Sequence, residues 1–146
     1  MKLLIKKLTE SASLPLRATE HSAGADLFAC IDSPVTISPG EIKMLPTGIS
    51  VECDDKNTAL LIYARSSLAS KYGITLANSV GVVDSDYRGE IKIPLINLGS
   101  QPYEITNGER IAQLVVTPVL FPKIEQSDTL SETARGEGGF GSTGKL

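Results

Sequence analysis

Short apolar runs separated by turn-forming residues limit the folds open to this chain more than any other feature of its sequence. The runs are rich in Val, Ile and Leu and lie near residues 2–8, 25–31, 35–37, 42–45, 48–52, 59–64, 74–77, 80–83, 91–96, 103–105 and 111–120. Between them stand residues that favour chain reversal, such as Pro39-Gly40 and Asn107-Gly108. Strands at this spacing, with no βαβ rhythm, predict an all-β sandwich or barrel.

One short helix is expected between the run that ends near residue 64 and the run that begins near residue 74. Ser66 or Ser67 can accept a hydrogen bond from a free backbone N–H group and so cap a helical turn over residues 68–72. Gly73 can adopt the left-handed conformation that ends such a turn. The sequence therefore predicts an all-β fold with a single short helix.

Length and composition narrow the class of protein. The chain has 146 residues, which suits one domain. Apolar residues make up 41% of it but aromatic residues only 5%, so the core must be mainly aliphatic. The formal net charge of -3 argues against a nucleic-acid-binding protein, which needs a basic face. No apolar stretch approaches the roughly 20 residues of a membrane span, and the first residues do not resemble a secretory leader. We expect a cytoplasmic protein with no nucleic-acid or membrane partner.

The character of the sequence changes near Pro122. Residues 122–146 lose apolar periodicity and gain Gly, Ser, Thr and acidic residues, a composition typical of a disordered tail. This tail also carries Arg135 and Phe140 among glycines, and an aromatic side chain is unusual in such a context. We predict a β domain over residues 1–121 and a flexible C-terminal arm beyond it that orders over a ligand. A simple frayed tail is the alternative.

A carboxylate-rich turn lies between two apolar runs at residues 78–89. Val82 and Val83 lead into it and Ile91 leads out, so the segment is interpreted as a β-hairpin with Asp84 near its tip. Asp and Gly at a reversal serve most often as turn formers. Together with an Arg-Ser-Ser turn and a Gly/Ser/Thr/Arg tail, the same carboxylate can instead belong to a site that holds a polyphosphate and directs water to it.

Five segments of the chain resemble, in order, the five motifs of the trimeric deoxyuridine triphosphate nucleotidohydrolases (dUTPases). They are Ala23-Gly24-Ala25-Asp26-Leu27, Ala64-Arg65-Ser66-Ser67-Leu68, residues 81–89, Gly108-Glu109-Arg110-Ile111-Ala112-Gln113-Leu114 and residues 135–144. The resemblance implies a jelly-roll or distorted β-barrel subunit and a homotrimer with three active sites at subunit boundaries, each covered by a C-terminal arm. It also implies hydrolysis of dUTP to dUMP and pyrophosphate, which limits uracil in DNA and supplies dUMP for dTMP synthesis.

The family resemblance assigns catalytic roles to three residues. Asp84 matches the carboxylate that orients and deprotonates the attacking water, and Gln113 would hold the same water through its amide. Asp26 would support the site through polar contacts or metal-bound water, but a structural ion pair with an arginine such as Arg110 is an equal alternative. Magnesium is the expected cofactor, held mainly by substrate phosphates and water rather than directly by protein side chains.

The resemblance also assigns the binding of the phosphates. Arg65, Ser66 and Ser67 would contact them from the first turn of the short helix, where backbone N–H groups are unpaired. Successive glycine N–H groups and nearby hydroxyls on the arm can form an anion-binding nest, and an aromatic ring there would stack over uracil as the arm closes. The arm residues expected to bind substrate are Arg135, Phe140, Gly141, Ser142 and Thr143.

The base and the sugar would lie between the arms of the predicted hairpin. By the same resemblance, Val82 and Val83 would bring the main chain against uracil and Asn78 would add its amide, while a narrow pocket would exclude the methyl group of thymine. Tyr87 would pack on the deoxyribose and leave no room for a 2′-hydroxyl. Lys92 lies near this pocket, although an ordinary exposed strand lysine is an equal interpretation.

Two other functions compete with dUTP hydrolysis. A dCTP deaminase is similar in its fold and its Arg-Ser-Ser-Leu-Ala run, but it requires a glutamate on the strand after the turn, where Pro94 stands in this chain. Because proline cannot carry a proton, deamination is disfavoured. A non-catalytic jelly-roll trimer is disfavoured because all the motif residues are present.

Overall fold

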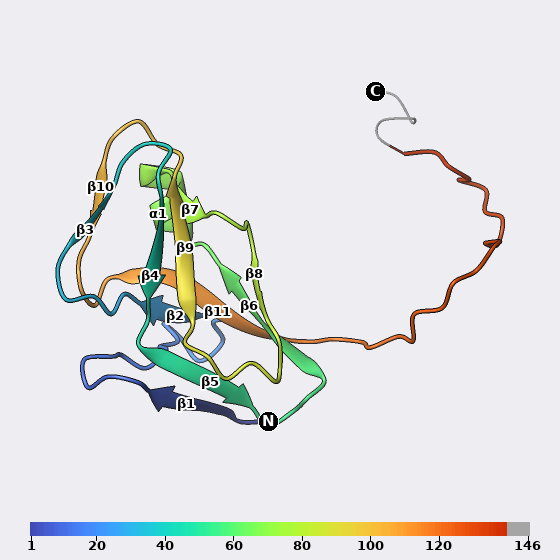
Figure 1. The fold of residues 1–146 in the computed structure, drawn as a ribbon, viewed down its shortest axis with the longest axis horizontal. Coiled ribbons are helices and arrows are strands. Elements are labelled where there is room, and N and C mark those ends of the chain that lie inside the picture. The colour runs from blue at the N-terminus through green and yellow to red at the C-terminus, as the bar shows by residue number, and fades with distance from the viewer. Residues whose placement is uncertain (140–146) are drawn as a thin grey trace.

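The computed structural model describes residues 1–139, so the predicted contacts of Phe140, Gly141, Ser142 and Thr143 lie outside the described residues. Over the described part of the chain, eleven strands and one helix follow one another (Figure 1). They are β1 (Leu3–Lys7), β2 (Ala25–Phe28), β3 (Val35–Ile37), β4 (Ile42–Pro46), β5 (Ile49–Cys53), β6 (Thr58–Tyr63), α1 (Ser66–Tyr72), β7 (Ile74–Leu76), β8 (Gly81–Val83), β9 (Lys92–Asn97), β10 (Tyr103–Ile105) and β11 (Arg110–Pro118). The prediction of an all-β fold with one short helix is confirmed.

Two antiparallel sheets carry most of the fold. One has the strand order β2-β11-β6-β8 and the other the order β4-β9-β7, while β1 pairs with β5 and β3 with β10. In the four-stranded sheet, Leu114 and Ile62 face each other and are buried. The preceding residue on β11, Gln113, faces Tyr63, and both lie on the opposite, outer face because side chains alternate along a strand. One face of the sheet is therefore buried, whereas the outer face is partly exposed and carries apolar side chains such as Val82 beside polar ones such as Gln113.

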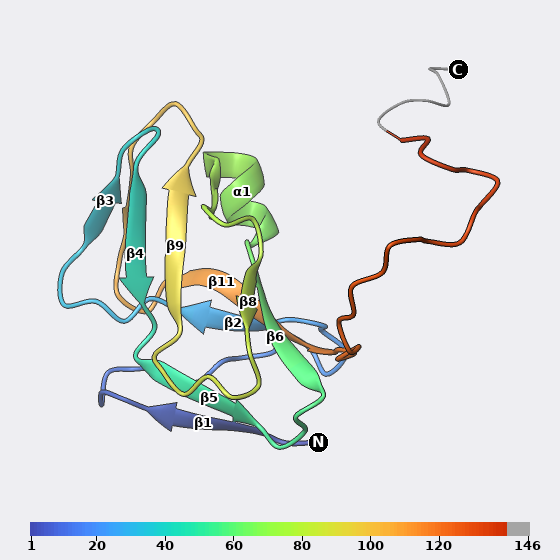
Figure 2. The same ribbon diagram turned by 45° about the vertical axis from the view of Figure 1, so that its right-hand side comes forward.

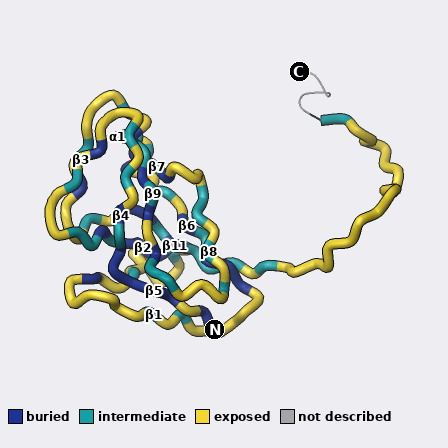
Figure 3. Tube along the Cα trace, viewed as in Figure 1, coloured by how far each residue is buried: buried dark blue, intermediate teal, exposed yellow. Residues whose placement is uncertain are grey.

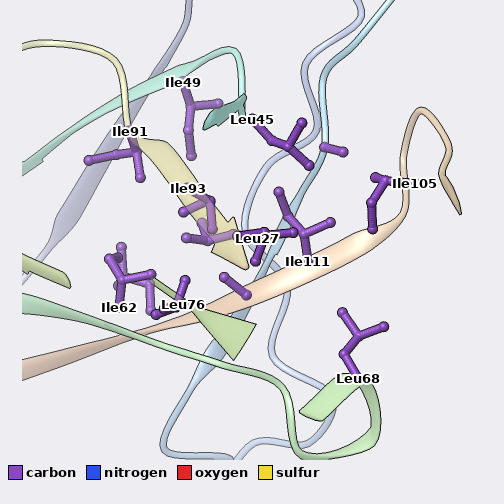
Figure 4. Packing of buried hydrophobic residues seen from close by; sticks show 14 of the residues in the cluster. Leu27, Leu45, Ile49, Ile62, Leu68, Leu76, Ile91, Ile93, Ile105 and Ile111 are labelled. Carbon is purple, nitrogen blue, oxygen red and sulfur yellow. The ribbon is translucent and has the colours of Figure 1, made fainter. Parts of the chain in front are cut away.

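The core lies between these sheets and is mainly aliphatic. Ile93 of β9, Leu27 of β2 and Ile111 of β11 are at most 1% exposed and belong to one cluster (Figure 4). Among the described residues, every fully buried member of this cluster is Ala, Val, Leu or Ile. The composition therefore predicted the nature of the core correctly.

The arms on either side of the acidic turn (residues 84–91) do not form a β-hairpin, so that prediction is wrong. β8 pairs with β6, whereas β9 pairs with β4 and β7 in the other sheet (Figure 2). The reason is burial: Ile91 and Ile93 are 3% and 0% exposed, and they reach the core only because β9 joins the second sheet. A two-stranded hairpin on its own would leave both side chains in water and is marginally stable.

The helix α1 begins at Ser66, two positions before the turn over residues 68–72 that the sequence predicts. Its N-cap is Arg65, which has no side-chain cap hydrogen bond, so the expectation that Ser66 or Ser67 is the cap is wrong. The guanidinium of Arg65 bonds to Asp26 instead, and the two serines lie in the first turn. Gly73 ends the helix in the left-handed conformation at φ 73°, as predicted.

The chain leaves the β domain after β11. Residues 119–139 contain no strand or helix and are mostly exposed, and they extend away from the sheets (Figure 1, Figure 3). Apolar side chains on this segment face solvent; for example, Phe121 is 71% exposed and Ile124 is 95% exposed. Within the described residues, no helix has the length and apolar character needed to cross a membrane.

Candidate active site

Two surface cavities contain most of the predicted site residues. The first, here called the inter-arm cavity, has a volume of about 320 Å³ and lies between β8 and β9. It is lined by all the residues predicted to contact base, sugar and attacking water from this part of the chain: Asn78, Val82, Val83, Asp84, Tyr87 and Lys92. The second, here called the arginine cavity, has a volume of about 350 Å³ and includes Asp26, Arg65, Ser66, Arg110 and Gln113.

The inter-arm cavity exists because the two arms belong to different sheets. β8 is the edge strand of its sheet, so the backbone groups on the side away from β6 are not used in a ladder. Since the backbone groups of successive residues point to opposite edges of a strand, every second residue of β8 presents its N–H and C=O groups to a ligand on this free edge. Pro94 lines the same cavity and pairs with Met44 in the β4–β9 ladder, so the position that a deaminase would need for a carboxylate carries no proton-transfer group.

The acidic turn places a carboxylate and a phenol at the mouth of the inter-arm cavity. Asp84 is exposed and its main-chain oxygen accepts a hydrogen bond from Tyr87 N at 3.1 Å. The Tyr87 hydroxyl donates to the main-chain oxygen of Glu90 at 3.1 Å. The Tyr87 ring therefore lies back over the turn, close to Gly89, where an added Cβ would come within 2.3 Å of the tyrosine hydroxyl.

Asp26 joins two arginines in the arginine cavity. Arg65 Nε donates to Asp26 Oδ1 at 2.9 Å, and Arg110 Nη1 donates to Asp26 Oδ2 at 3.2 Å. The Asp26 side chain is only 13% exposed, whereas those of Arg65 and Arg110 are 27% and 44% exposed. Two guanidinium groups and one carboxylate leave a net positive charge, so this cavity suits an anion.

A β-bulge brings Arg110 to this cavity. The register of β11 against β2 shifts between Arg110 and Ala112, and Ile111 is 1% exposed while Ala112 is fully buried. With strict alternation, Arg110 would lie on the core face with Ala112; the extra residue turns it to the outer face beside Asp26. Bulges often redirect side chains in this way next to functional sites.

Gln113 is held between the helix and β2. Its Nε2 atom donates to Ala64 O at 2.9 Å. Its Oε1 atom lies against Gly24, where an added Cβ would fall only 2.4 Å from that oxygen. Glycine at position 24 therefore allows the carboxamide oxygen to remain at the cavity as a free acceptor.

The two cavities lie apart within one chain. Asp84 follows Val83, which pairs with Leu60 on β6, whereas Gln113 pairs with Tyr63 at the other end of β6. This places the two residues about 13 Å apart along the strands and about 10 Å apart across them. Figure 2 shows the same arrangement, with α1 near one end of β8 and the acidic turn at the other. A single chain does not bring Asp84 and Gln113 to one water molecule.

The remaining predicted residues are not gathered into either cavity. Ser67 is exposed in the first turn of α1, beside Ser66. Arg135 lies on the extended arm, and its Nε donates to Gly138 O at 2.8 Å. Sequence reasoning also missed a residue: it treated Arg110 only as a partner for Asp26, although Arg110 lines the arginine cavity itself.

Comparison with known proteins gives a consistent result. The family model described as dUTPase matches residues 10–144. A deoxyuridine 5'-triphosphate nucleotidohydrolase of Rickettsia felis is 54% identical over 141 residues, covering 96% of this chain and 95% of that protein. A protein of the same name from Desulfitobacterium hafniense is 48% identical over 144 residues, covering 99% of this chain and 95% of that protein.

Solved structures agree in fold. A variant of the Staphylococcus bacteriophage 80alpha dUTPase, solved with dUpNHpp, has a TM-score of 0.89 and 27% sequence identity over 99% of both chains. A dUTPase variant from phage phi11 of S. aureus, whose structure describes the coordination of a structural Mg(II) ion, has a TM-score of 0.81 and 23% identity over 90% of this chain and 100% of that one.

Proposed function

This chain belongs to the dUTPase family, and we propose that it hydrolyses dUTP to dUMP and pyrophosphate with a water molecule that Asp84 activates for attack on the α-phosphate. The observation that carries the proposal is the division of the predicted residues between a nucleoside-sized cavity and a cationic cavity. One suits the base and sugar, and the other suits the phosphates. Removal of dUTP by this reaction would limit uracil in DNA, and the dUMP formed would be available for dTMP synthesis.

Recognition of the nucleoside would take place in the inter-arm cavity. The unladdered edge of β8 offers N–H and C=O groups to the donors and acceptors of uracil, and Asn78 adds an amide. Apolar walls from Ile62 and Leu76 restrict the space beside the base, which would exclude the methyl group of thymine. Tyr87 would pack on the deoxyribose, and Lys92 would border the same pocket.

Binding of the triphosphate would take place in the arginine cavity. Arg65 and Arg110 supply charge, and Asp26 holds both guanidinium groups in a fixed position. Ser66 and Ser67 add hydroxyl and backbone donors from the first turn of α1. Because the arginines are already oriented, little side-chain order would be lost when phosphate binds.

Asp84 and Gln113 would act on the same water from two different chains. Asp84 is an exposed carboxylate that can accept a proton, and Gln113 Oε1 is a free acceptor that can orient the water. Since one chain keeps these groups apart, the site would form where the inter-arm cavity of one copy meets the arginine cavity of the next. Contact between two different surfaces forms a closed ring when the rotation between copies closes, and we propose the homotrimer that the family resemblance implies. The C-terminal arm, with Arg135, would then close over a site at the subunit boundary.

Magnesium is the proposed cofactor. Within residues 1–139, no group of three or more His, Cys, Asp or Glu side chains is placed to hold a metal ion, and both carboxylate oxygens of Asp26 are engaged by arginines. The remaining donors suit an ion that takes its oxygen ligands mainly from the triphosphate and water, as Mg²⁺ commonly does. When bound, magnesium would neutralise part of the phosphate charge.

Mixed oligomers of two inactive variants test this proposal. Asp84→Asn removes the base and Gln113→Ala removes the water-orienting amide, so each variant alone should release almost no pyrophosphate from dUTP and Mg²⁺. Co-expression with two affinity tags yields oligomers that contain both chains. If each site of the trimer combines Asp84 of one chain with Gln113 of the next, every trimer that contains both variants will carry both native residues at one of its three sites.

The expected result is therefore recovery of about one third of the native rate in the doubly purified trimer. A mixture of each variant with itself, carrying the same two tags, is the matched control. No recovery would mean that both residues act within one chain, and no dUTP hydrolysis by the unsubstituted protein would overturn the proposed reaction.

A further inference from the structure

The end of the acidic turn is fixed to the β domain by hydrogen bonds at Glu90 and Ile91. Thr47 Oγ1 donates to Ile91 O at 2.6 Å, and Ile91 N donates to Ile49 O at 2.9 Å. Immediately before Ile91, the side chain of Glu90 crosses to the β4–β5 turn, where its Oε1 accepts a hydrogen bond from Gly48 N at 2.9 Å. Glu90 therefore lines the inter-arm cavity, and its side chain also connects the acidic turn to the β domain.

The partner of this bond is itself held in place. Gly48 has φ 69°, and an added Cβ would come within 2.8 Å of Ala12 Cβ and Cys30 Sγ. Its main-chain oxygen accepts a hydrogen bond from Leu8 N at 2.7 Å. The Gly48 N–H group is therefore a rigid donor, and the carboxylate that it binds is fixed relative to the core.

Tyr87 depends on the same residue for its position. The Tyr87 hydroxyl donates to the main-chain oxygen of Glu90, and Tyr87 is 46% exposed, so packing alone does not fix its ring. Displacement of the Glu90 backbone would move the acceptor that holds the phenol. Two connections from the β domain therefore meet at the Glu90 carbonyl that holds the Tyr87 hydroxyl. One is the bond from Gly48 N to the Glu90 side chain, and the other is the bond from Ile91 N, of the same peptide group, to Ile49 O.

The charge of Glu90 is partly balanced where it stands. Its Oε2 lies 3.6 Å from Lys92 Nζ, and its side chain is 23% exposed. A carboxylate beside a cavity that receives an anionic nucleotide would otherwise oppose binding. Hydrogen bonding by Gly48 and the nearby ammonium group explain how a carboxylate can occupy this wall.

We propose that Glu90 is a positioning residue that holds Tyr87 against the sugar and thereby determines the preference for deoxyribose over ribose. This inference rests on the proposed function, in which Tyr87 excludes a 2′-hydroxyl. Glu90 does not touch the reacting atoms. Glu90 acts by keeping the Tyr87 phenol in position, so removal of the Glu90 side chain affects the preference for deoxyribose over ribose more than the rate with dUTP.

The test compares dUTP with UTP in four variants: Glu90→Ala, Glu90→Gln, Tyr87→Ala and the Tyr87→Ala/Glu90→Ala double variant. Glu90→Ala should lower the ratio of kcat/KM for dUTP over UTP by about fivefold or more, since ribose is admitted when the phenol moves. Glu90→Gln keeps an oxygen acceptor for Gly48 N and should retain most of the native ratio. In the Tyr87→Ala background, adding Glu90→Ala should leave the ratio unchanged, because the group through which Glu90 acts is already absent.

Glu52→Ala is the matched control. Glu52 also anchors the acidic turn, since its Oε1 accepts from Arg88 Nη2 at 3.0 Å, but it lies outside the inter-arm cavity. Its removal should leave the ratio as in the native protein. The relative dissociation constants of dUMP and UMP, measured by calorimetry, report the same preference without turnover, so loss of activity in a variant does not hide the result.

An unchanged ratio in Glu90→Ala would overturn the proposal. So would an equal fall in the native and Tyr87→Ala backgrounds, which would show that Glu90 acts on the sugar independently of Tyr87. Failure of the proposed function would give a different result, because the unsubstituted protein itself would then not hydrolyse dUTP.

Discussion

Replacing Gly24 by alanine should slow turnover while leaving the fold intact. The added Cβ would lie 2.4 Å from Gln113 Oε1 and 3.2 Å from Gln113 Cβ and Cδ. Since ordinary contact needs about 3.5 Å, the carboxamide oxygen must retreat by about 1 Å. Such a displacement of a water-orienting group can cost about 10²-fold in rate. We therefore expect kcat for dUTP to fall by about that factor.

The stability of this variant should hardly change. The nearest atom, Gln113 Oε1, is at the far end of a flexible side chain and can move away by rotation, whereas the contact with Gln113 Cβ at 3.2 Å requires only a small shift. Gly24 does not have a positive φ, so alanine is allowed there, and restricting the unfolded chain stabilises by about 0.4–1 kcal/mol. Steady-state pyrophosphate release gives kcat, and thermal unfolding gives the stability.

Two comparisons isolate the cause. Gly40→Ala serves as the control for a glycine substitution: Gly40 has φ 79° and open space around it, so it should lose about 1 kcal/mol of stability and no activity. In a Gln113→Ala background, Gly24→Ala should have no further effect on kcat. Native turnover by Gly24→Ala, or an equal loss in the Gln113→Ala background, would refute the role assigned to Gln113 Oε1.

Three further changes have defined outcomes. Asp84→Asn should preserve binding of dUTP, measured by calorimetry, and lower kcat by about 10²-fold or more, because the amide cannot accept the proton of water; undiminished turnover would exclude Asp84 as the base. Deletion of residues 132–146 should leave the unfolding temperature unchanged and sharply lower kcat/KM, whereas full activity would mean that the arm does not cover the site. Burial, with the hydrogen bond to Glu109, raises the pKa of Tyr103 above its ordinary value of 10.0, so the contribution of Tyr103 to the free energy of unfolding should be constant below pH 10 and fall as the pH rises above it. Tyr103→Phe should flatten that fall in chemical denaturation, and an equally steep fall would assign it to another group.

Local sequence signals predicted the elements well because each strand carries its own evidence. The eleven apolar runs correspond to the eleven strands between Leu3 and Pro118 of the described chain, and Gly73 ends the helix where its freedom at positive φ is needed. The pairing between strands, in contrast, could not be predicted from local sequence. Residues 78–93 contain a reversal flanked by apolar runs, which favours a hairpin, but the choice of β4, β6 and β7 as partners depends on segments elsewhere in the chain.

Some residues of the candidate site could be grouped from the sequence because they belong to one local segment. Asn78, Val83 and Tyr87 lie close together in the chain and were assigned to one pocket, which they line. Arg110 was harder to assign, because strict alternation along β11 places it on the core face. Only the bulge before Ala112 turns it outward, and a bulge has no sequence signal strong enough to predict it here.

The separation of the two cavities explains why neither one is sufficient. The inter-arm cavity contains the carboxylates of Asp84 and Glu90 against the single ammonium group of Lys92, so alone it would oppose a triphosphate. The arginine cavity has the opposite charge balance but offers no enclosed apolar wall for a base. If both sets lay side by side in one chain, Asp84 could pair with Arg65 or Arg110 and lose its freedom to accept a proton. Instead Asp26 occupies those arginines, and Asp84 stays exposed at the far end of β6. Bringing the two cavities together between copies would therefore supply a base and a cationic site that are already separated, so the catalytic carboxylate would meet the arginines only with phosphate between them.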